Sequence, residues 1–180
     1  MPIVPDDKNW TWVLERPCGE CGFVAETFDP ADAPALLIAN GARWRGLLAH
    51  PKVAVRPNDE KWSALEYACH VRDVFRLYLY RLNLMMSEEG PHFPNWDQDE
   101  TALTNRYSEQ DAKVVADEIE VAAADLAAGF AKVKVSDYER TGFRSDGAAF
   151  TIGSFARYLA HDPVHHVWDV EQTFVANDSH

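Results

Sequence analysis

The clearest pattern in the chain is an apolar stripe between residues 64 and 85. Apolar side chains recur there at alternating steps of four and three residues, at Ala64, Ala68, Val71, Phe75, Tyr78, Leu82 and Met85. This spacing keeps them on one face of an α-helix over about six turns. The segment Ser63-Ala64-Leu65-Glu66 forms a capping box, in which Ser63 accepts from the N–H of Glu66 and Glu66 reaches back. The pattern therefore predicts a helix that begins directly after Ser63.

Three further segments have helical character. The first begins near Asp29-Pro30, with Asp as N-cap and Pro at the first helical position, and ends before Pro51. An Ala-rich segment runs from about Ser108 to Val133, and a last one from about Thr151 to Phe174. Together, these four amphipathic segments predict an all-α fold, a four-helix bundle.

The connections between these helices differ in length. Residues 87–107 contain Gly90, Pro91 and Pro94, and a connection this long is typically a crossover or functional. Residues 134–150 are rich in turn formers, and strand signals are few. With 180 residues, the chain has the length of one domain. We expect an extended N-terminal arm at 1–28, followed by the bundle at 29–180.

Composition narrows the range of partners. Lys and Arg number 17 against 29 Asp and Glu, a net charge of −12, which argues against nucleic acid or an anionic membrane as partner. No apolar run reaches the roughly 18 residues of a membrane span, and residues 1–12 lack the apolar core of a secretory signal. Three cysteines make no disulfide framework. We therefore expect a cytoplasmic protein with a small-molecule substrate, and the aromatic rings of the arm, if exposed, favour a homodimer.

Histidines of the last helix are the best candidates for chemistry. His161 and His165 are four residues apart, so both lie on one helix face and can share a metal ion. His70 lies at the margin of the apolar stripe of residues 64–85 and is the candidate third ligand. Three imidazoles leave a position open for water or substrate, as in a catalytic site, and Zn²⁺ or Ni²⁺ would suit them.

Other residues near the pair leave alternatives open. Asp162 and His166 form a second i,i+4 pair on an adjacent face, and Asp162 is a candidate fourth ligand. Asp162 or Asp169 could orient a ligand or act as a base. Pro163 lies between the two histidines, where it either kinks the helix or makes it restart with Asp162 as N-cap. A restart would separate His161 from His165.

A Cys-x-x-Cys motif, Cys18-Gly19-Glu20-Cys21, lies in the arm. Such a motif can be half of a zinc site or a redox pair. A zinc site needs two more ligands, and Cys69, the third cysteine, falls inside a helix. We therefore favour a tight glycine-containing turn over metal binding or redox chemistry for this motif.

The order of these motifs resembles the DinB/YfiT-like family of metal-binding four-helix bundles. The resemblance rests on Lys61-Trp62-Ser63, then Glu66, His70 and Asp73, and finally His161-x-x-x-His165, and it covers about residues 30–175. It implies an up-down-down-up bundle in which the long 87–107 segment is the crossover. It also implies His70, His161 and His165 as ligands of a divalent metal.

This superfamily includes enzymes that use a low-molecular-weight thiol, mycothiol or bacillithiol, as isomerases or S-transferases, beside many relatives with no known activity. The resemblance therefore implies a metal-dependent enzyme that acts on a small electrophile with such a thiol. An open metal site would bind the thiol as thiolate and lower its pKa. Arg144, in the turn Arg144-Ser145-Asp146-Gly147, would be a clamp for a carboxylate of substrate or thiol. The alternatives are a non-enzymatic, metal-stabilised bundle that binds a ligand or partner, and a redox protein built on Cys18 and Cys21.

Overall fold

The computed structural model describes residues 9–178, with side chains up to Val175. Residues 1–8 of the expected arm and residues 179–180 of the expected bundle lie outside the described residues. The helices are α1 (Ala33–Leu47), α2 (Ala64–Ser87), α3 (Gln98–Thr104), α4 (Ala112–Phe130) and α5 (Ile152–Asp178). Short 3-10 helices are η1 (Trp10–Leu14), η2 (Ala25–Thr27), η3 (Pro30–Asp32), η4 (Tyr107–Glu109) and η5 (Val135–Asp137), and the strands are β1 (His92–Phe93), β2 (Thr141–Arg144) and β3 (Ala149–Thr151).

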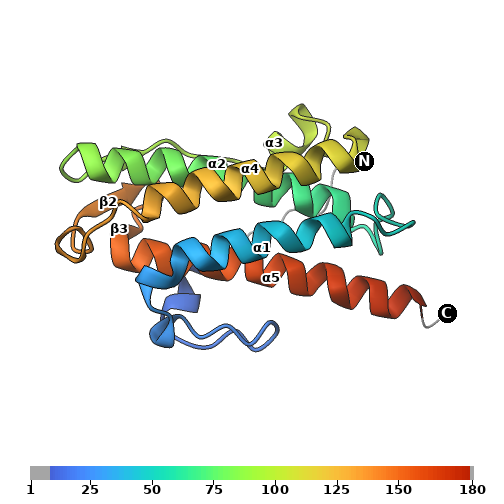
Figure 1. The fold of residues 1–180 in the computed structure, drawn as a ribbon, viewed down its shortest axis with the longest axis horizontal. Coiled ribbons are helices and arrows are strands. Elements are labelled where there is room, and N and C mark those ends of the chain that lie inside the picture. The colour runs from blue at the N-terminus through green and yellow to red at the C-terminus, as the bar shows by residue number, and fades with distance from the viewer. Residues whose placement is uncertain (1–8, 179–180) are drawn as a thin grey trace.

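Four long helices form the bundle, as the sequence predicts. Each of α1 and α2 packs against both α4 and α5. In Figure 1, α1 and α5 run in one direction along the bundle, and α2 and α4 run in the opposite direction. The topology is therefore up-down-down-up, with the segment between α2 and α4 returning along the bundle as the crossover. That segment is not plain coil, since it carries β1, α3 and η4.

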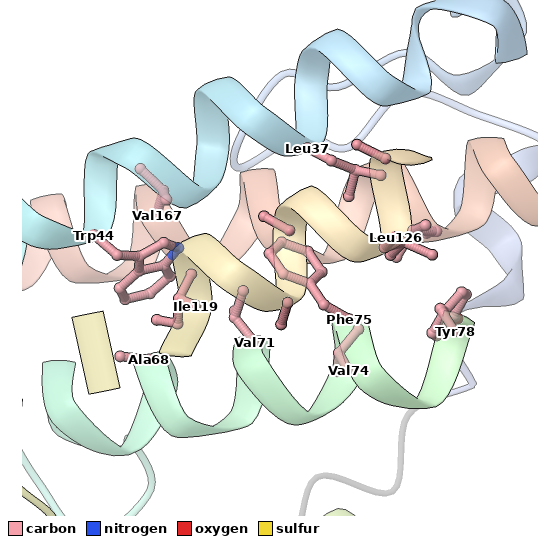
Figure 2. Close-up of a cluster of buried hydrophobic side chains, with 14 of the residues drawn as sticks. Leu37, Trp44, Ala68, Val71, Val74, Phe75, Tyr78, Ile119, Leu126 and Val167 are labelled. Atoms are coloured by element: carbon pink, nitrogen blue, oxygen red, sulfur yellow. The ribbon is translucent and has the colours of Figure 1, made fainter. Parts of the chain in front are cut away.

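Helix ends follow the predicted caps closely. Ser63 Oγ accepts from Glu66 N and the Glu66 side chain accepts from Ser63 N, so the capping box of α2 is complete. Asp29 caps η3, which leads into α1, and Asp111 rather than Ser108 caps α4. The core between the helices is apolar, and Figure 2 shows Leu37, Trp44, Phe75, Ile119 and Leu126 pointing toward one another from α1, α2 and α4.

The small sheet is the element that the sequence interpretation lacked. β2 and β3 form an antiparallel hairpin, and β1 from the crossover pairs in parallel with β2. Gly142 in β2 lies so close to Phe93 and Met85 that an added Cβ would be 2.4 Å from Phe93 Cζ. The hairpin therefore closes one end of the bundle and ties the crossover to it.

The arm packs along α5. Val13, Cys18 and Ala25 are buried, and Arg157 Nε on α5 donates to Phe28 O at 3.1 Å. Trp10, Trp12 and Phe23 are half-buried rather than exposed, so the argument for a homodimer from exposed rings on the arm does not hold. Among the described residues, no helix is long and apolar enough to cross a membrane.

Candidate metal centres

Helix α5 carries His161 and His165 on one face and Asp162 and His166 on the adjacent face. It is continuous from Ile152 to Asp178 with Pro163 inside it, so of the two alternatives at Pro163 the restart does not occur. Asn40 of α1 donates to the Pro163 carbonyl oxygen at 2.8 Å, which fixes this turn against the bundle. The rings of His161 and His165 lie on one face, with centroids 5.0 Å apart and ring planes at 37° to each other.

Four ligand-type side chains meet at the first face. Cys18, Cys21, His161 and His165 each offer one atom, and these atoms all lie within 4.8 Å of one another. Cys18 Sγ lies 3.6 Å from His165 Nδ1, and both cysteines are free thiols. Cys18, His161 and His165 are buried.

A tight turn brings the two cysteines to this face. Gly22 N donates to Cys18 O, Cys18 N donates to Phe23 O, and Gly22 takes a positive φ of 74°, which favours glycine. The expected turn is therefore present, but its cysteines also meet two histidines from the other end of the chain. The signal was in the sequence: Cys-x2-Cys with His-x3-His is the spacing of a Cys2His2 zinc site.

A second group forms on the adjacent face of α5. His70 of α2 meets Asp162 and His166, and their ligand atoms lie within 4.8 Å of one another. Asp162 Oδ2 is 3.8 Å from His70 Nε2 and 3.8 Å from His166 Nε2. His70 Nδ1 and Asp162 Oδ1 are buried and have no hydrogen-bond partner among the described residues. Buried polar atoms without partners are costly, so both fit a site that a cation completes.

The protonation states suit metal binding at both groups. Burial lowers the pKa of His70 and of His165, and lowers that of His161 to about 4, so the imidazoles are neutral at pH 7. Burial alone would raise the pKa of Asp162, but the imidazoles of His166 and His70 outweigh it and the pKa falls. Burial raises the pKa of the Cys21 thiol to about 11, so thiolate formation there needs a cation.

The three histidines expected to share one metal are thus divided between two groups. His161 and His165 lie with the cysteines, and His70 lies with Asp162 and His166. Asp169 lies between the groups, with Oδ2 3.3 Å from His166 Nδ1 and 3.6 Å from His165 Nε2. It is therefore placed to orient an imidazole of each group, which is one of the roles expected for it.

Aromatic side chains pack against the second group. Trp96 of the crossover stacks on His70 with centroids 5.5 Å apart, and Tyr67 lies 4.9 Å from His166. Arg144, the expected clamp, donates to Asp146 at 2.9 and 2.5 Å and to Tyr158 Oη at 3.3 Å. Its charge is therefore already matched by Asp146.

Arg81 is a basic residue that the sequence interpretation missed. It is only 6% exposed, and its Nε has no hydrogen-bond partner among the described residues. Its Nη2 donates to Pro94 O at 3.4 Å, so the guanidinium is held against the crossover. The signal was an arginine next to Leu82 of the apolar stripe, where a charge is costly without a partner.

Comparison with known proteins agrees with this architecture. The structure is similar to that of YfiT from Bacillus subtilis, described as a probable metal-dependent hydrolase with an unusual four-helix bundle topology, with a TM-score of 0.64. The match covers 95% of this chain and 93% of YfiT, with 14% sequence identity, and so shows a likeness in fold. No curated protein matches the chain. The model of the DinB superfamily matches residues 42–170, and this chain therefore belongs to the DinB superfamily.

Proposed function

We propose that this protein is a divalent-metal-dependent enzyme that uses a low-molecular-weight thiol, as an S-transferase or isomerase, on a small electrophile. The observation that carries the proposal is the convergence of His70, Asp162 and His166, two of which bear buried polar atoms without partners. We assign the reaction to this group rather than to the trio of His70, His161 and His165.

Three protein ligands leave room for a reacting molecule. Two imidazoles and a carboxylate are ligands that Zn²⁺, Ni²⁺ and other divalent metals accept. A cation bound there would act as a Lewis acid and lower the pKa of a thiol or water at the open position. The group of four ligands offers no such opening, so it suits a structural role better.

Neighbouring side chains suit a small anionic substrate or thiol cofactor. Arg81 Nε, which is buried without a hydrogen-bond partner among the described residues, would gain one from a carboxylate, and Arg144 donates to Tyr158 Oη at 3.3 Å. Trp96 covers one side of His70 and limits access of bulk water. Asp169 accepts from His166 and holds that ring in place.

The thiol part of the proposal rests on the superfamily rather than on a feature of the fold. Mycothiol or another low-molecular-weight thiol, kept reduced in the cytoplasm, would provide the nucleophile. The description of YfiT as a probable metal-dependent hydrolase fits the same chemistry with water in place of the thiol. Assays should therefore include hydrolysis of activated esters and amides beside thiol conjugation.

The test uses the purified chain loaded with Zn²⁺ or Ni²⁺. We expect tighter mycothiol binding with metal than after chelation, and turnover of a small electrophile. His70→Ala and His166→Ala should each reduce turnover by more than about 100-fold, beyond what loss of an outer-shell partner costs. The control is His92→Ala, which removes an exposed imidazole of β1. Equal thiol affinity with and without chelator, or full turnover by His166→Ala, would contradict the proposal.

A further inference from the structure

We propose that Cys18, Cys21, His161 and His165 form a structural zinc site that fastens the N-terminal arm to α5. The site is separate from the proposed reaction centre, because it shares no ligand with His70, Asp162 and His166. It binds Zn²⁺ with four protein ligands and so leaves no position for substrate.

The ligand geometry suits tetrahedral Zn²⁺. With Zn–S near 2.3 Å and Zn–N near 2.0–2.1 Å, a tetrahedral angle separates sulfur from nitrogen by about 3.6 Å. Cys18 Sγ and His165 Nδ1 are 3.6 Å apart, and all four ligand atoms lie within 4.8 Å of one another. Two thiolates and two imidazoles are a set that selects zinc over Mg²⁺ or Ca²⁺.

The atoms around the ligands agree with this assignment. His165 Nε2 lies 3.3 Å from Glu20 Oε2 and 3.6 Å from Asp169 Oδ2, so a proton on Nε2 leaves Nδ1 free to bind the ion. Metal-binding histidines usually donate their second N–H to a carboxylate in this way. His161 Nε2 is buried without a hydrogen-bond partner among the described residues, as a nitrogen is when its partner is an ion.

An apolar shell encloses the group. Trp10, Trp12 and Phe23 of the arm lie 5.7, 6.4 and 5.9 Å from the His161 ring, measured between centroids. Two thiolates neutralise the charge of Zn²⁺, so the occupied site carries no net charge into these surroundings. The same rings would shield a zinc–thiolate centre from water and competing ligands.

The site joins parts of the chain that are far apart in sequence. Cys18 and His165 are separated by 147 residues, so the zinc would act as a cross-link that closes a long loop. It would hold both the arm and the turn of α5 around Pro163. That turn also carries Asp162 and His166, so an intact zinc site would steady the proposed reaction centre.

The experiment measures zinc in full-length protein purified under reducing conditions. We expect one tightly held zinc per chain, which dialysis with a weak chelator leaves in place, in wild type and in the control Cys69→Ser. Cys69 is buried on α2 and faces Tyr107 O and the Gln110 side chain, outside the group. Cys18→Ser and Cys21→Ser should lose this zinc, and their arms should be cut faster by protease than the arm of Cys69→Ser.

Co²⁺ replacement gives a second readout that does not depend on the stability of a variant. Wild type and Cys69→Ser loaded with Co²⁺ should show thiolate-to-cobalt charge-transfer absorption and the intense bands of a tetrahedral ion. Retention of the tight zinc by Cys21→Ser, or absence of that absorption in wild type, would overturn the proposal. A disulfide between Cys18 and Cys21 in protein freshly purified under reducing conditions would overturn it as well.

Failure of this inference and failure of the proposed function are distinguishable. If Cys18→Ser keeps its metal while His70→Ala and His161→Ala both lose it, one cation binds the three histidines and the zinc site is refuted. If both cysteine variants lose zinc but His166→Ala retains full turnover, the zinc site stands and the proposed reaction centre fails.

Discussion

Asn40 links α1 to the turn of α5 that carries residues of both candidate metal groups. Its Nδ2 donates to Pro163 O at 2.8 Å, and its Oδ1 accepts from Trp44 Nε1 at 3.1 Å. Asn40 is 5% exposed and Trp44 is fully buried. We predict that Asn40→Ala destabilises the fold and weakens metal binding at both groups.

The size of the effect follows from the two hydrogen bonds. Removal of the amide leaves the Trp44 indole N–H buried without an acceptor, and an orphaned donor costs about 1–3 kcal/mol. Loss of the bond to Pro163 O adds about 1 kcal/mol. The sum is about 2–4 kcal/mol, and for a chain of this length it lowers the Tm by roughly 4–16 °C.

Thermal unfolding of matched variants tests this reasoning. Asn83→Ala makes the same replacement at an exposed position of α2, where it should be neutral or slightly stabilising. Trp44→Phe removes the donor that Asn40→Ala would orphan. In a double-mutant cycle, Asn40→Ala should therefore cost about 1–3 kcal/mol less in the Trp44→Phe background.

Two results would refute the assigned role of Asn40. One is a Tm for Asn40→Ala equal to that of Asn83→Ala. The other is an equal cost of Asn40→Ala with tryptophan and with phenylalanine at position 44. Unchanged metal affinity in Asn40→Ala would refute only the link to the turn at Pro163.

Three further predictions concern packing and protonation. Gly41→Ala places a Cβ 2.8 Å from Ala123 Cβ and should lower the free energy of unfolding in urea by about 1–3 kcal/mol. In the control Gly46→Ala, on the same helix, the added Cβ meets nothing within 4 Å and should raise that free energy by up to about 1 kcal/mol. Equal effects of the two substitutions would contradict the close approach of α1 and α4. Burial alone would raise the pKa of Glu66, but its hydrogen bonds lower this pKa below 4.5. Glu66→Gln should therefore reduce the free energy of unfolding by about 1.5–3 kcal/mol at pH 7, and by progressively less as the pH falls below 4.5. Unfolding of both proteins at pH 7 and pH 4 would show this difference. Burial lowers the pKa of His161 to about 4, against 6.5 in the unfolded chain. In chelator-treated protein the unfolded chain therefore binds the proton first, and the free energy of unfolding should fall by up to about 3 kcal/mol between pH 6.5 and 4. An equal fall in His161→Phe would contradict this.

Local rules of the sequence account for the secondary structure of the bundle. The stripe from Ala64 to Met85 and the capping box at Ser63 depend only on residues within about one helical turn of each other. Helix α2 begins where they predict. The same holds for the Asp29-Pro30 start that leads into α1. The sequence does not predict the hairpin of β2 and β3, because its strands are short, and because β2 pairs with the short β1 of the distant crossover.

The composition of the metal groups could be predicted only in part. The i,i+4 rule correctly paired His161 with His165 and Asp162 with His166 on adjacent faces of one helix. It could not say which of these pairs faces His70, because one residue along a helix turns the side chain by about 100°. The rotation of α5 against α2 decides this, and it depends on packing across the whole core.

The sequence by itself determined the four helices and their caps, and it placed His161 and His165 on one helix face, since each depends on neighbours within a few positions. Tertiary structure alone decided that the Cys18–Cys21 turn folds back onto His161 and His165, a meeting between parts of the chain 147 residues apart. The two motifs are visible in the sequence, but nothing local shows that they meet, because burial of the arm against α5 brings them together. The same physics buried Arg81 against the crossover, where Nη2 donates to Pro94 O and Nε has no hydrogen-bond partner among the described residues.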